Sequence, residues 1–365
     1  MAWRNRVEVS YGALRRNLEA VRAAAGGRPV IAVIKADAYG LGLERCARIY
    51  HGAGAAALAV AAISEADRVR TTVPEARVLL LGSPLPEERP AVVASGYEVS
   101  CSSLEEVEEF AHLAHPGAPQ SVHVNIDTGM GRFGALPDDG VQMVRAVLMA
   151  PSLRLAGVCT HYAMAMEPVF SAHQEERFAS VMTQLPPLPN GCWIHQANSE
   201  GVVMRPAGVS TVVRAGLLLT GVVPIGCPSL SVTPAVSWLS AISLVKTLPA
   251  GHSISYNGTH ILSRDSVLGV VPVGYADGYP LSLSGKGKVL IQGQRCPVLG
   301  RVTMDYCIVD LTDLPQRPRP GEGVVLLGRQ GTATITVQEL AHLAGTIPYD
   351  ILCGLRGRCE VVGVP

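Results

Sequence analysis

The sequence predicts an α/β protein with an N-terminal (β/α)8 TIM barrel followed by a mostly β C-terminal domain. Short apolar runs alternate with amphipathic segments about eight times between residues 29 and 218, the pattern of a barrel of parallel strands and helices. After a Pro- and Ser-rich stretch near Gly226, the pattern changes to closely spaced strand-like segments. Polar residues also stand where the early strands end, the face on which such barrels carry their chemistry.

The composition excludes several classes of protein. The chain has 365 residues, of which 48% are hydrophobic and 16% charged, which argues against disorder or a coiled coil. Its 30 basic and 30 acidic residues cancel, and no basic stripe stands out. We therefore expect neither a nucleic acid nor a membrane surface as a partner.

The same inspection gives an expected compartment. The longest apolar stretch, around residues 53–63, is too short to cross a bilayer, and no secretory pattern opens the chain. The nine cysteines are scattered without a C-x-x-C pair, so we expect reduced core thiols and no metal site. A cytoplasmic protein is predicted.

The first predicted barrel strand is the apolar run at residues 29–34, which ends at Lys35. Val, Ile and Ala without alternation predict a strand buried on both faces. A buried ammonium group is unfavourable, so Lys35 has two interpretations. Either it reaches water at the strand end, or partial burial keeps its amine neutral enough to attack a carbonyl group and form a Schiff base.

The other barrel elements follow the same alternation. Residues 10–24 place apolar side chains on one face and predict a helix with Ser10 as its N-cap. Helices are also expected at 103–115, 138–149 and 171–185. The remaining strands are expected at 56–63, 77–82, 97–101, 121–127, 153–162, 193–198 and 211–218. A doubly wound open sheet remains the alternative, because periodicity alone does not close a barrel.

A mostly β domain is predicted beyond the barrel, with one short helix at 336–344. We assign residues 8–230 to the barrel and 231–365 to the β domain, which residues 1–7 also join. Its strands are expected at 235–248, 259–262, 266–273, 287–291, 294–298, 307–311 and 323–327.

Several polar motifs lie at predicted strand ends and turns. The glycines between Asp127 and Arg132 let the backbone approach a ligand, and Arg132 offers a planar fork for a carboxylate. Ser199 begins a short helical segment whose N–H groups and hydroxyl would favour a phosphate. Arg214 lies in an apolar strand and needs a partner. Taken singly, these motifs are explained as well or better by ordinary structural roles, namely a solvated loop, a helix cap and a structural ion pair.

Together and in this order, the motifs resemble the alanine racemase family, the fold-type III enzymes that use pyridoxal 5′-phosphate. The segment Val33-Ile-Lys-Ala-Asp-Ala-Tyr-Gly-Leu-Gly42 matches the family's cofactor-lysine signature, and the resemblance covers essentially the whole chain. The later matches are Asp127-Thr-Gly-Met-Gly-Arg132, Thr160-His161, Ala197-Asn-Ser199, Arg214-Ala-Gly216, Ser255-Tyr256, Gly274-Tyr-Ala-Asp-Gly278, Gly300-Arg-Val-Thr-Met-Asp305 and Tyr349-Asp-Ile-Leu-Cys-Gly354.

The resemblance implies a two-base racemase in which Lys35 binds the cofactor as a Schiff base. Lys35 and Tyr256 would act on opposite faces of the substrate's α-carbon. A free tyrosine, with a pKa of about 10, is a poor base, and His161 and Arg214 match the neighbours that lower this pKa in the family. Arg214 would also donate to the pyridine nitrogen, which weakens the ring as an electron sink and restrains transamination.

The resemblance also implies the remaining binding residues. The cofactor phosphate would be held by Tyr39, Ser199, Tyr349 and the backbone N–H groups of Gly216 and Leu217. The carboxylate of a small amino-acid substrate would be bound by Arg132 and the backbone of Met304. We expect a head-to-tail homodimer in which the β domain of each chain lies over the partner's barrel. The β-domain residues placed there would be Tyr256, Tyr275, Met304 and Asp305.

The chain departs from the family beside the substrate-binding arginine. Asn125 stands where many relatives have a lysine that is carbamylated and orients that arginine. Asparagine cannot be carbamylated, but its carbonyl can accept a hydrogen bond from Arg132. We hypothesise that Asn125, alone or with a bound chloride, takes over this role.

The access corridor departs as well. Met166 and Leu281 stand where relatives carry an aspartate and an arginine, whereas Arg301 and Ile347 are retained. We therefore predict that the entrance to the access corridor is more apolar than in these relatives. Thr220 and Arg356 also replace a common tyrosine and serine.

We expect an amino-acid racemase whose substrate is alanine. The alternative is a serine/alanine or broader-specificity racemase of the same family. A fold-type III decarboxylase is disfavoured because its cysteine-bearing motif is not found. A non-catalytic cofactor-binding protein is disfavoured because Lys35 and Tyr256 are both present.

Overall fold

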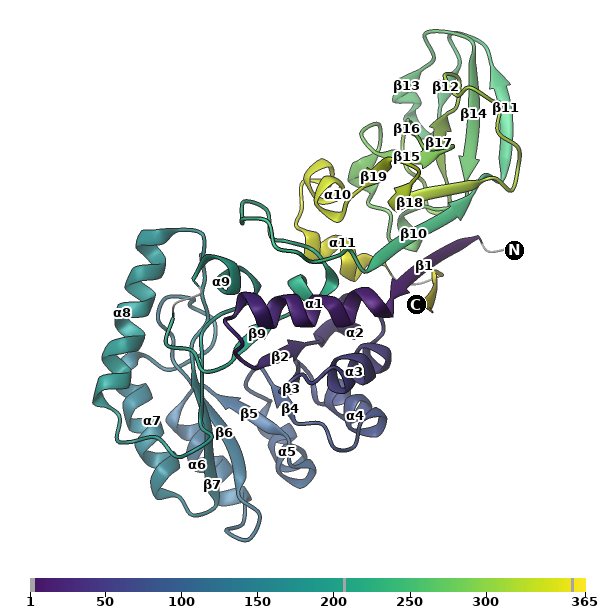
Figure 1. Ribbon diagram of the computed structural model, residues 1–365. Helices are drawn as coiled ribbons and strands as arrows, with labels where there is room; N and C mark the ends of the chain where they lie inside the picture. Colours follow the sequence, from purple (N-terminus) through teal and green to yellow (C-terminus); the bar gives the residue numbers. More distant parts are fainter. Residues whose placement is uncertain (1–3, 206–207, 356–357) are drawn as a thin grey trace. The chain divides into compact units, whose positions relative to one another are not determined.

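The computed structural model describes residues 4–205, 208–355 and 358–365 (Figure 1). These residues form two compact units. The barrel unit comprises Leu14–Ala38 and Leu43–Val232, and the β unit comprises Tyr39–Gly42, Thr233–Pro365 and the described part of residues 1–13. Arg356 and the first three residues of the segment 1–7 lie outside the described residues.

The barrel unit is built on eight parallel strands in the order β8-β7-β6-β5-β4-β3-β2-β9. Backbone N–H groups of Thr211 and Arg214 donate to the carbonyls of Ile194 and Ala197 at 2.8 and 2.9 Å, which joins the β8 and β9 ends of the sheet. This confirms the predicted barrel over the open sheet. The strands are β2 (Val30–Val33), β3 (Ala57–Val60), β4 (Val78–Leu80), β5 (Glu98–Cys101), β6 (Gln120–Asn125), β7 (Leu153–Cys159), β8 (Trp193–His195) and β9 (Val213–Ala215).

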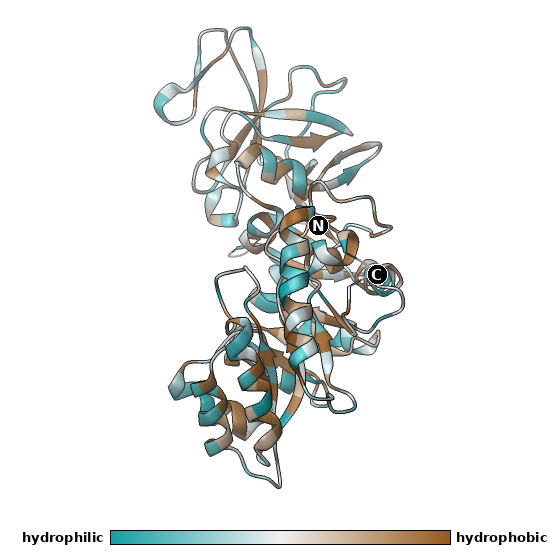
Figure 2. Ribbon diagram, turned by 90° about the vertical axis from the view of Figure 1, so that its left-hand side faces the viewer, coloured by the Kyte–Doolittle hydropathy of each residue, from teal (hydrophilic) through white to brown (hydrophobic). Residues whose placement is uncertain are grey.

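Helices surround these strands (Figure 1). Ser10 Oγ accepts a hydrogen bond from the N–H of Ala13 at 3.2 Å, so the predicted cap of α1 is confirmed. The barrel helices contain both hydrophilic and hydrophobic residues, as expected for helices with one face on a sheet (Figure 2). The helices are α1 (Tyr11–Ala24), α3 (Leu43–Gly52), α4 (Ile63–Thr72), α5 (Arg89–Ser95), α6 (Leu104–Leu113), α7 (Pro137–Met149), α8 (Pro168–Gln184) and α9 (Ser199–Met204).

The β unit contains a ten-stranded sheet and a two-stranded sheet. The large sheet has the order β11-β14-β17-β16-β15-β18-β10-β1-β20, and β19 pairs with β18. The strands are β1 (Asn5–Ser10), β10 (Val236–Ala241), β11 (Leu244–Leu248), β12 (Ser253–Ile254), β13 (His260–Ile261), β14 (Ser266–Val271), β15 (Lys288–Ile291), β16 (Gln294–Leu299), β17 (Cys307–Asp310), β18 (Gly323–Gln330), β19 (Ala333–Ile335) and β20 (Glu360–Val364).

The predicted strand at 235–248 is wrong in one respect, because it forms two strands. The N–H of Ile242 donates to Glu322 and that of Ser243 donates to Val270, so the chain leaves one neighbouring strand for another between them. The predicted helix at 336–344 is α10 (Val337–Ala344), and a second helix, α11 (Pro348–Gly354), was not predicted.

None of the helices in the described chain combines the length and the apolar content that a bilayer-spanning segment requires.

Candidate active site

The carboxyl ends of the barrel strands gather several of the predicted polar residues. Lys35 follows β2, His161 follows β7, Ser199 follows β8 and Arg214 lies within β9. Arg214 Nη2 lies 3.0 Å from His161 Nδ1. The charges of Arg214, Arg132 and Lys35 all act on His161. These side chains therefore meet at one face of the barrel.

Lys35 stands at the start of a left-handed turn, α2 (Lys35–Tyr39). Ala36, Asp37 and Ala38 have φ values of 54°, 55° and 54°, and Tyr39 has 58°. None of these residues is glycine, and a left-handed conformation costs roughly 1–2 kcal/mol for each. Backbone strain of this kind persists only where its surroundings hold it, and it is concentrated at functional sites.

The Glu65 carboxylate holds this turn in place. It accepts hydrogen bonds from the N–H of Ala36 at 2.6 Å and of Ala61 at 3.0 Å, so it ties the turn to the start of α4. Asp37 Oδ1 accepts from the N–H of Leu43 at 3.1 Å. Glu65 was not predicted, because it lies 30 residues after Lys35 with no motif around it.

Lys35 is chemically distinctive within the barrel. The chain has four lysines, at positions 35, 246, 286 and 288, so Lys35 is the only one in the barrel sequence. Its side chain is half-buried, as the Schiff-base interpretation requires.

Arg214 is buried, with 6% of its surface exposed. It donates to the carbonyls of Thr160 and His195 at 2.7 and 2.9 Å, and to Nδ1 of both His161 and His195. Burial lowers the pKa of this guanidinium. Among the described residues, no carboxylate contacts Arg214, so its charge is met by neutral acceptors alone.

His161 is neutral at pH 7 in this environment. Burial, followed by the charges of Arg214, Arg132 and Lys35, lowers the pKa of His161 to about 3. Because Arg214 can only donate, His161 Nδ1 must accept and the single ring proton lies on Nε2. His161 therefore presents an N–H donor.

A cluster of hydrogen-bond donors surrounds Ser199. Its Oγ accepts from the N–H groups of Gly216 and Leu218 at 3.1 and 3.4 Å. The cap of α9 is Asn198, whose Oδ1 accepts from the N–H of Gly201 at 2.8 Å. The Ser199 hydroxyl is therefore not required as the cap, and backbone N–H groups crowd around it, which suits an anion.

The loop that carries Arg132 is folded by Asp127. Asp127 Oδ1 accepts from the N–H groups of Gly129 and Met130, both at 2.8 Å. The Arg132 side chain is exposed. Asn125 Oδ1 accepts from the Cys159 thiol at 3.7 Å, and within the described chain it has no hydrogen bond to Arg132.

The β unit contains the other predicted residues. The rings of Tyr39 and Tyr349 lie 5.8 Å apart, between centroids, so these two tyrosines share one environment. Tyr256 is 68% exposed and is flanked by Ser255 and Asn257, whose φ values are 62° and 64°. Two left-handed neighbours thus present Tyr256 at the surface.

Tyr275, Met304 and Asp305 lie on two loops that pack together. The N–H of Tyr275 donates to the carbonyl of Thr303 at 3.1 Å. A Cβ at Gly274 would lie 2.2 Å from that same carbonyl oxygen, so glycine is required for this approach.

Arg358 and Asp277, which were not predicted as site residues, hold these loops together. Arg358 donates to Asp305 at 2.7 Å and to both oxygens of the buried Asp277 at 3.1 and 3.0 Å. Asp277 lies within a quoted motif, but its partner is 81 residues away. Separation of that length gives no sequence signal.

The residues of the predicted corridor have exposed side chains. Met166, Leu281 and Ile347 are 38%, 39% and 58% exposed, and Arg301 is exposed as well. Thr220 is buried and donates to the carbonyl of Leu217 at 2.7 Å, so its hydroxyl is satisfied within its own turn, η2 (Leu217–Thr220).

Both parts of the chain match known families. The family model described as alanine racemase, N-terminal domain, matches residues 9–224, and that described as alanine racemase, C-terminal domain, matches residues 235–362. The alanine racemase of Symbiobacterium thermophilum is 38% identical over 359 residues, which cover 96% of this chain and 94% of that protein.

Solved structures agree with the sequence relatives. The alanine racemase of Streptomyces coelicolor superposes with a TM-score of 0.90 at 35% identity, over 99% of this chain and 98% of that one. The alanine racemase of Bartonella henselae, solved with covalently bound pyridoxal phosphate, superposes with a TM-score of 0.91 at 27% identity over the full length of both chains.

Proposed function

The chain belongs to the alanine racemase family, and we propose on that premise that it interconverts L- and D-alanine with pyridoxal 5′-phosphate. The observation that carries this proposal is Lys35, the only lysine of the barrel, on a strained turn beside His161 and Arg214. When bound, the cofactor supplies an electron-withdrawing ring that acidifies the substrate's α-hydrogen.

The residues present fit this cofactor. Within the part of the chain that the structure describes, the acceptors around Arg214 are neutral, so it can donate to a ring nitrogen without giving up a carboxylate partner. The N–H groups around Ser199 suit a phosphate. Lys35 would hold the cofactor covalently, Arg214 would donate to its pyridine nitrogen, and its phosphate would be held by Tyr39, Ser199, Gly216, Leu217 and Tyr349.

Two groups are proposed to move the α-proton. Lys35 acts on one face, and Tyr256, carried by the β domain, acts on the other. His161 has its proton on Nε2 and can donate it toward a phenolate, and the charge of Arg214 acts in the same direction. In this proposal residues 8–230 bind most of the cofactor, and residues 231–365 supply Tyr349 and the second base.

Substrate binding is assigned to a second set of residues. Arg132, exposed on the Asp127 loop, and the backbone of Met304 bind the substrate carboxylate. Because Asn125 Oδ1 is engaged by Cys159, a chloride between Asn125 and Arg132 is the arrangement we propose for orienting the guanidinium. Tyr275 and Asp305 complete the substrate side.

We propose a head-to-tail homodimer as the active form. Tyr256, Tyr275 and Met304 are 68%, 45% and 53% exposed, so all three are available for contact with a partner. Covering by a partner's barrel would bury them and bring Tyr256 to the partner's Lys35. None of the nine cysteines, all of which lie in the described chain, forms a disulfide, which suits a reducing cytoplasm.

A broader substrate range is the second candidate. Met166 and Leu281 are exposed apolar residues at positions where relatives carry charges. Larger or less polar amino acids would therefore pass through the access corridor more readily. A chiral-chromatography panel of L-alanine, L-serine and larger L-amino acids separates the two candidates. Alanine should be turned over fastest, and an equal or higher rate with another amino acid would favour the second.

The two-base assignment is tested on the same enzyme. Tyr256→Phe should lower racemisation by about 10²–10⁴-fold, while the cofactor stays bound and the α-hydrogen of one enantiomer still exchanges with D2O. Tyr306→Phe, at another exposed tyrosine of the β unit, is the matched control and should behave like the unmodified enzyme. Unchanged racemisation by Tyr256→Phe would show that Tyr256 is not a base.

A further inference from the structure

A chain of hydrogen bonds runs through the barrel interior from Arg214 to Glu98. Arg214 donates to His195 Nδ1, and His195 Nε2 lies 2.8 Å from His123 Nδ1. His123 Nε2 in turn lies 2.9 Å from Glu98 Oε2. The four side chains are between 0% and 6% exposed, so water does not interrupt the chain.

The chemistry at the two ends fixes the direction of every bond. A guanidinium can only donate, so His195 Nδ1 must accept. A carboxylate can only accept, so His123 Nε2 must donate. If both rings are neutral, His195 donates from Nε2 to His123 Nδ1, and each imidazole carries its proton on Nε2.

The surroundings keep the rings neutral and the carboxylate charged. Burial, reinforced by Arg214, holds the pKa of His195 well below its usual value. Burial also lowers the pKa of His123, although Glu98 opposes this shift. Burial raises the pKa of Glu98, but hydrogen bonds from His123 and Arg77 outweigh it and bring that pKa to about 2.

We propose that Glu98 and His123 are positioning residues that fix the Arg214 guanidinium through His195. No carboxylate of the described chain reaches Arg214 directly, whereas this path connects it to one through two aligned imidazoles. The inference rests on the proposed function, because it matters for turnover only if Arg214 contacts the cofactor.

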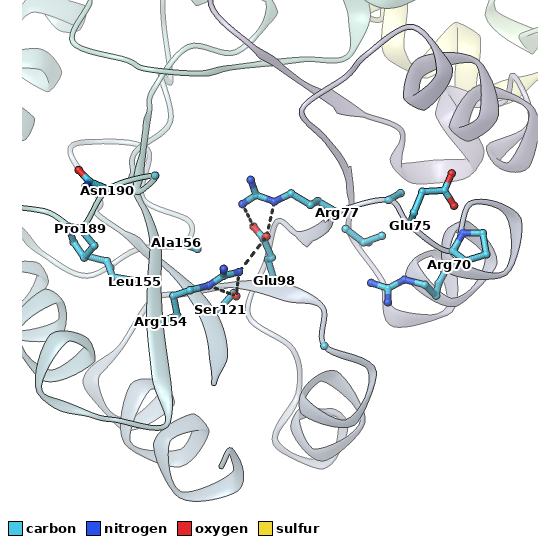
Figure 3. A pocket seen from close by; sticks show the side chains of 15 residues that line it. Arg70, Glu75, Arg77, Glu98, Ser121, Arg154, Leu155, Ala156, Pro189 and Asn190 are labelled. Atoms are coloured by element: carbon cyan, nitrogen blue, oxygen red, sulfur yellow. Dashed lines mark hydrogen bonds and ion pairs between the residues drawn. The ribbon is translucent and has the colours of Figure 1, made fainter. Parts of the chain in front are cut away.

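The hydrogen-bond chain ends at Glu98, the first residue of β5, and therefore at the amino ends of the barrel strands. There Arg77 donates to both oxygens of Glu98 at 2.8 and 3.1 Å (Figure 3). The Arg77 guanidinium lies 3.7 Å from the ring centroid of Trp193. Arg154 donates to Ser121 and lies 4.0 Å from Glu98. Arg77 and Arg154 line a cavity of about 650 Å³. The Glu98 carboxylate also contacts His123, which is buried in the barrel interior.

Nitrogen-15 labelling of the histidines tests the chain without any substitution in it. Long-range proton–nitrogen spectra distinguish the two neutral tautomers from the imidazolium, and loss of a signal in His123→Asn or His195→Asn assigns each ring. We expect both rings as the Nε2–H tautomer at pH 7, in the holoenzyme and in the cofactor-free protein. An Nδ1–H tautomer or an imidazolium at either position would overturn the proposal.

Glu98→Gln tests the consequence for turnover. The amide keeps the shape but can donate as well as accept, so the direction of the chain is no longer fixed. We expect an Nδ1–H population at His123 and a fall in kcat of about tenfold, the size of one lost charge-assisted hydrogen bond, with KM changed less than about twofold. Unchanged kcat and tautomer in a variant with an intact circular-dichroism spectrum would overturn the proposal.

Arg154→Gln is the matched control. It removes a mostly exposed charge beside Glu98 and leaves the chain intact, so the tautomers and kcat should stay within about twofold of the unmodified enzyme. A loss equal to that of Glu98→Gln would show that any charge change at this mouth has the same effect, which contradicts the proposal. Absence of racemisation in the unmodified enzyme would instead refute the proposed function, whereas the tautomer measurement needs no turnover.

Discussion

The two mouths of the barrel hold arginines in opposite circumstances, because the Arg77 side chain is 40% exposed and Arg214 is buried. At the amino ends of the strands, Arg77 is paired with Glu98 through two hydrogen bonds and lies against Trp193. At the carboxyl ends, Arg214 is more deeply buried, and its acceptors among the described residues are carbonyl oxygens and imidazole nitrogens.

This difference separates a structural charge from a functional one. An ion pair that is complete within the chain needs no ligand to balance its charges. A buried cation with neutral partners keeps a donor and a charge available for something that binds. The backbone follows the same division, because the strained turn after Lys35 lies at the mouth that carries Arg214.

The largest expected effect is the difference in kcat between two variants in which the arginine of one mouth is replaced by lysine. Arg214→Lys keeps the charge but loses the fork that reaches several acceptors, so kcat should fall by at least about 100-fold. Arg77→Lys should change kcat by less than about threefold, because one amine can still pair with Glu98. Steady-state kinetics and the visible absorbance of the bound cofactor measure both. Equal losses in the two variants would remove the distinction between the mouths.

The strained turn gives the next effect. Glu65→Gln replaces an oxygen that accepts from Ala36 by an amide that can donate, so the turn should relax and kcat should fall by about tenfold. Glu88→Gln is the matched control, since Glu88 accepts from the N–H of Leu85 at 2.8 Å in the same capping geometry but does not touch this turn. Activity lost equally in both variants would mean that the effect is general destabilisation.

Acid should affect the two mouths in different pH windows. The pKa of His161 is lowered to about 3, so the unfolded chain takes up its proton first, near pH 6.5, and the stability this residue contributes is lost as the pH falls from there toward 3. The pKa of Glu98 is lowered to about 2, so its contribution is complete above about pH 4.5 and is lost only below it.

Urea unfolding of the cofactor-free protein at pH 6.5 and pH 5.0 checks this division. His161→Asn should reduce the loss of unfolding free energy between these two values by up to about 1.4 kcal/mol per pH unit. Protonation of Glu98 itself contributes little to the loss in this window, because its pKa of about 2 lies far below it. An identical pH slope for His161→Asn and the unmodified protein would contradict the assignment of a neutral His161.

The smallest effect is expected at the exposed side of the amino-end mouth. Arg154 is 61% exposed, and its ion pair with Glu98 is 4.0 Å long. Arg154→Ala should therefore change the free energy of unfolding by no more than about 1 kcal/mol, measured by thermal and urea denaturation. A much larger loss would show that both arginines at this mouth, rather than Arg77 alone, balance Glu98.

Much of the barrel could be predicted from the sequence because its strands are continuous apolar runs. Each of the eight runs became a strand, since burial on both faces leaves little room for polar residues. The left-handed turn could not be predicted, because no glycine marks Ala36 to Tyr39 and the bond that holds it comes from Glu65. A local pattern cannot reveal conformations that distant contacts impose.

The interior histidines show the same limit. His123 lies in an apolar run and has no motif of its own, and its partner His195 is 72 residues away. Only the closure of the barrel brings the two rings together. The β unit gives a second example, because β1 and β20 come from opposite ends of the chain and pair in parallel. β20 was not predicted, since a local pattern does not reveal so distant a partner.

Borohydride reduction followed by peptide mapping tests the central claim most directly. The chain has only four lysines, and three of them lie outside the barrel. After reduction of the purified holoenzyme, mass spectrometry should find the cofactor fixed to the peptide that contains Lys35, and to no peptide in the Lys35→Ala variant. Fixation at Lys246, Lys286 or Lys288, or none in an enzyme that racemises alanine, would contradict the placement of the active site at the carboxyl ends of the barrel strands.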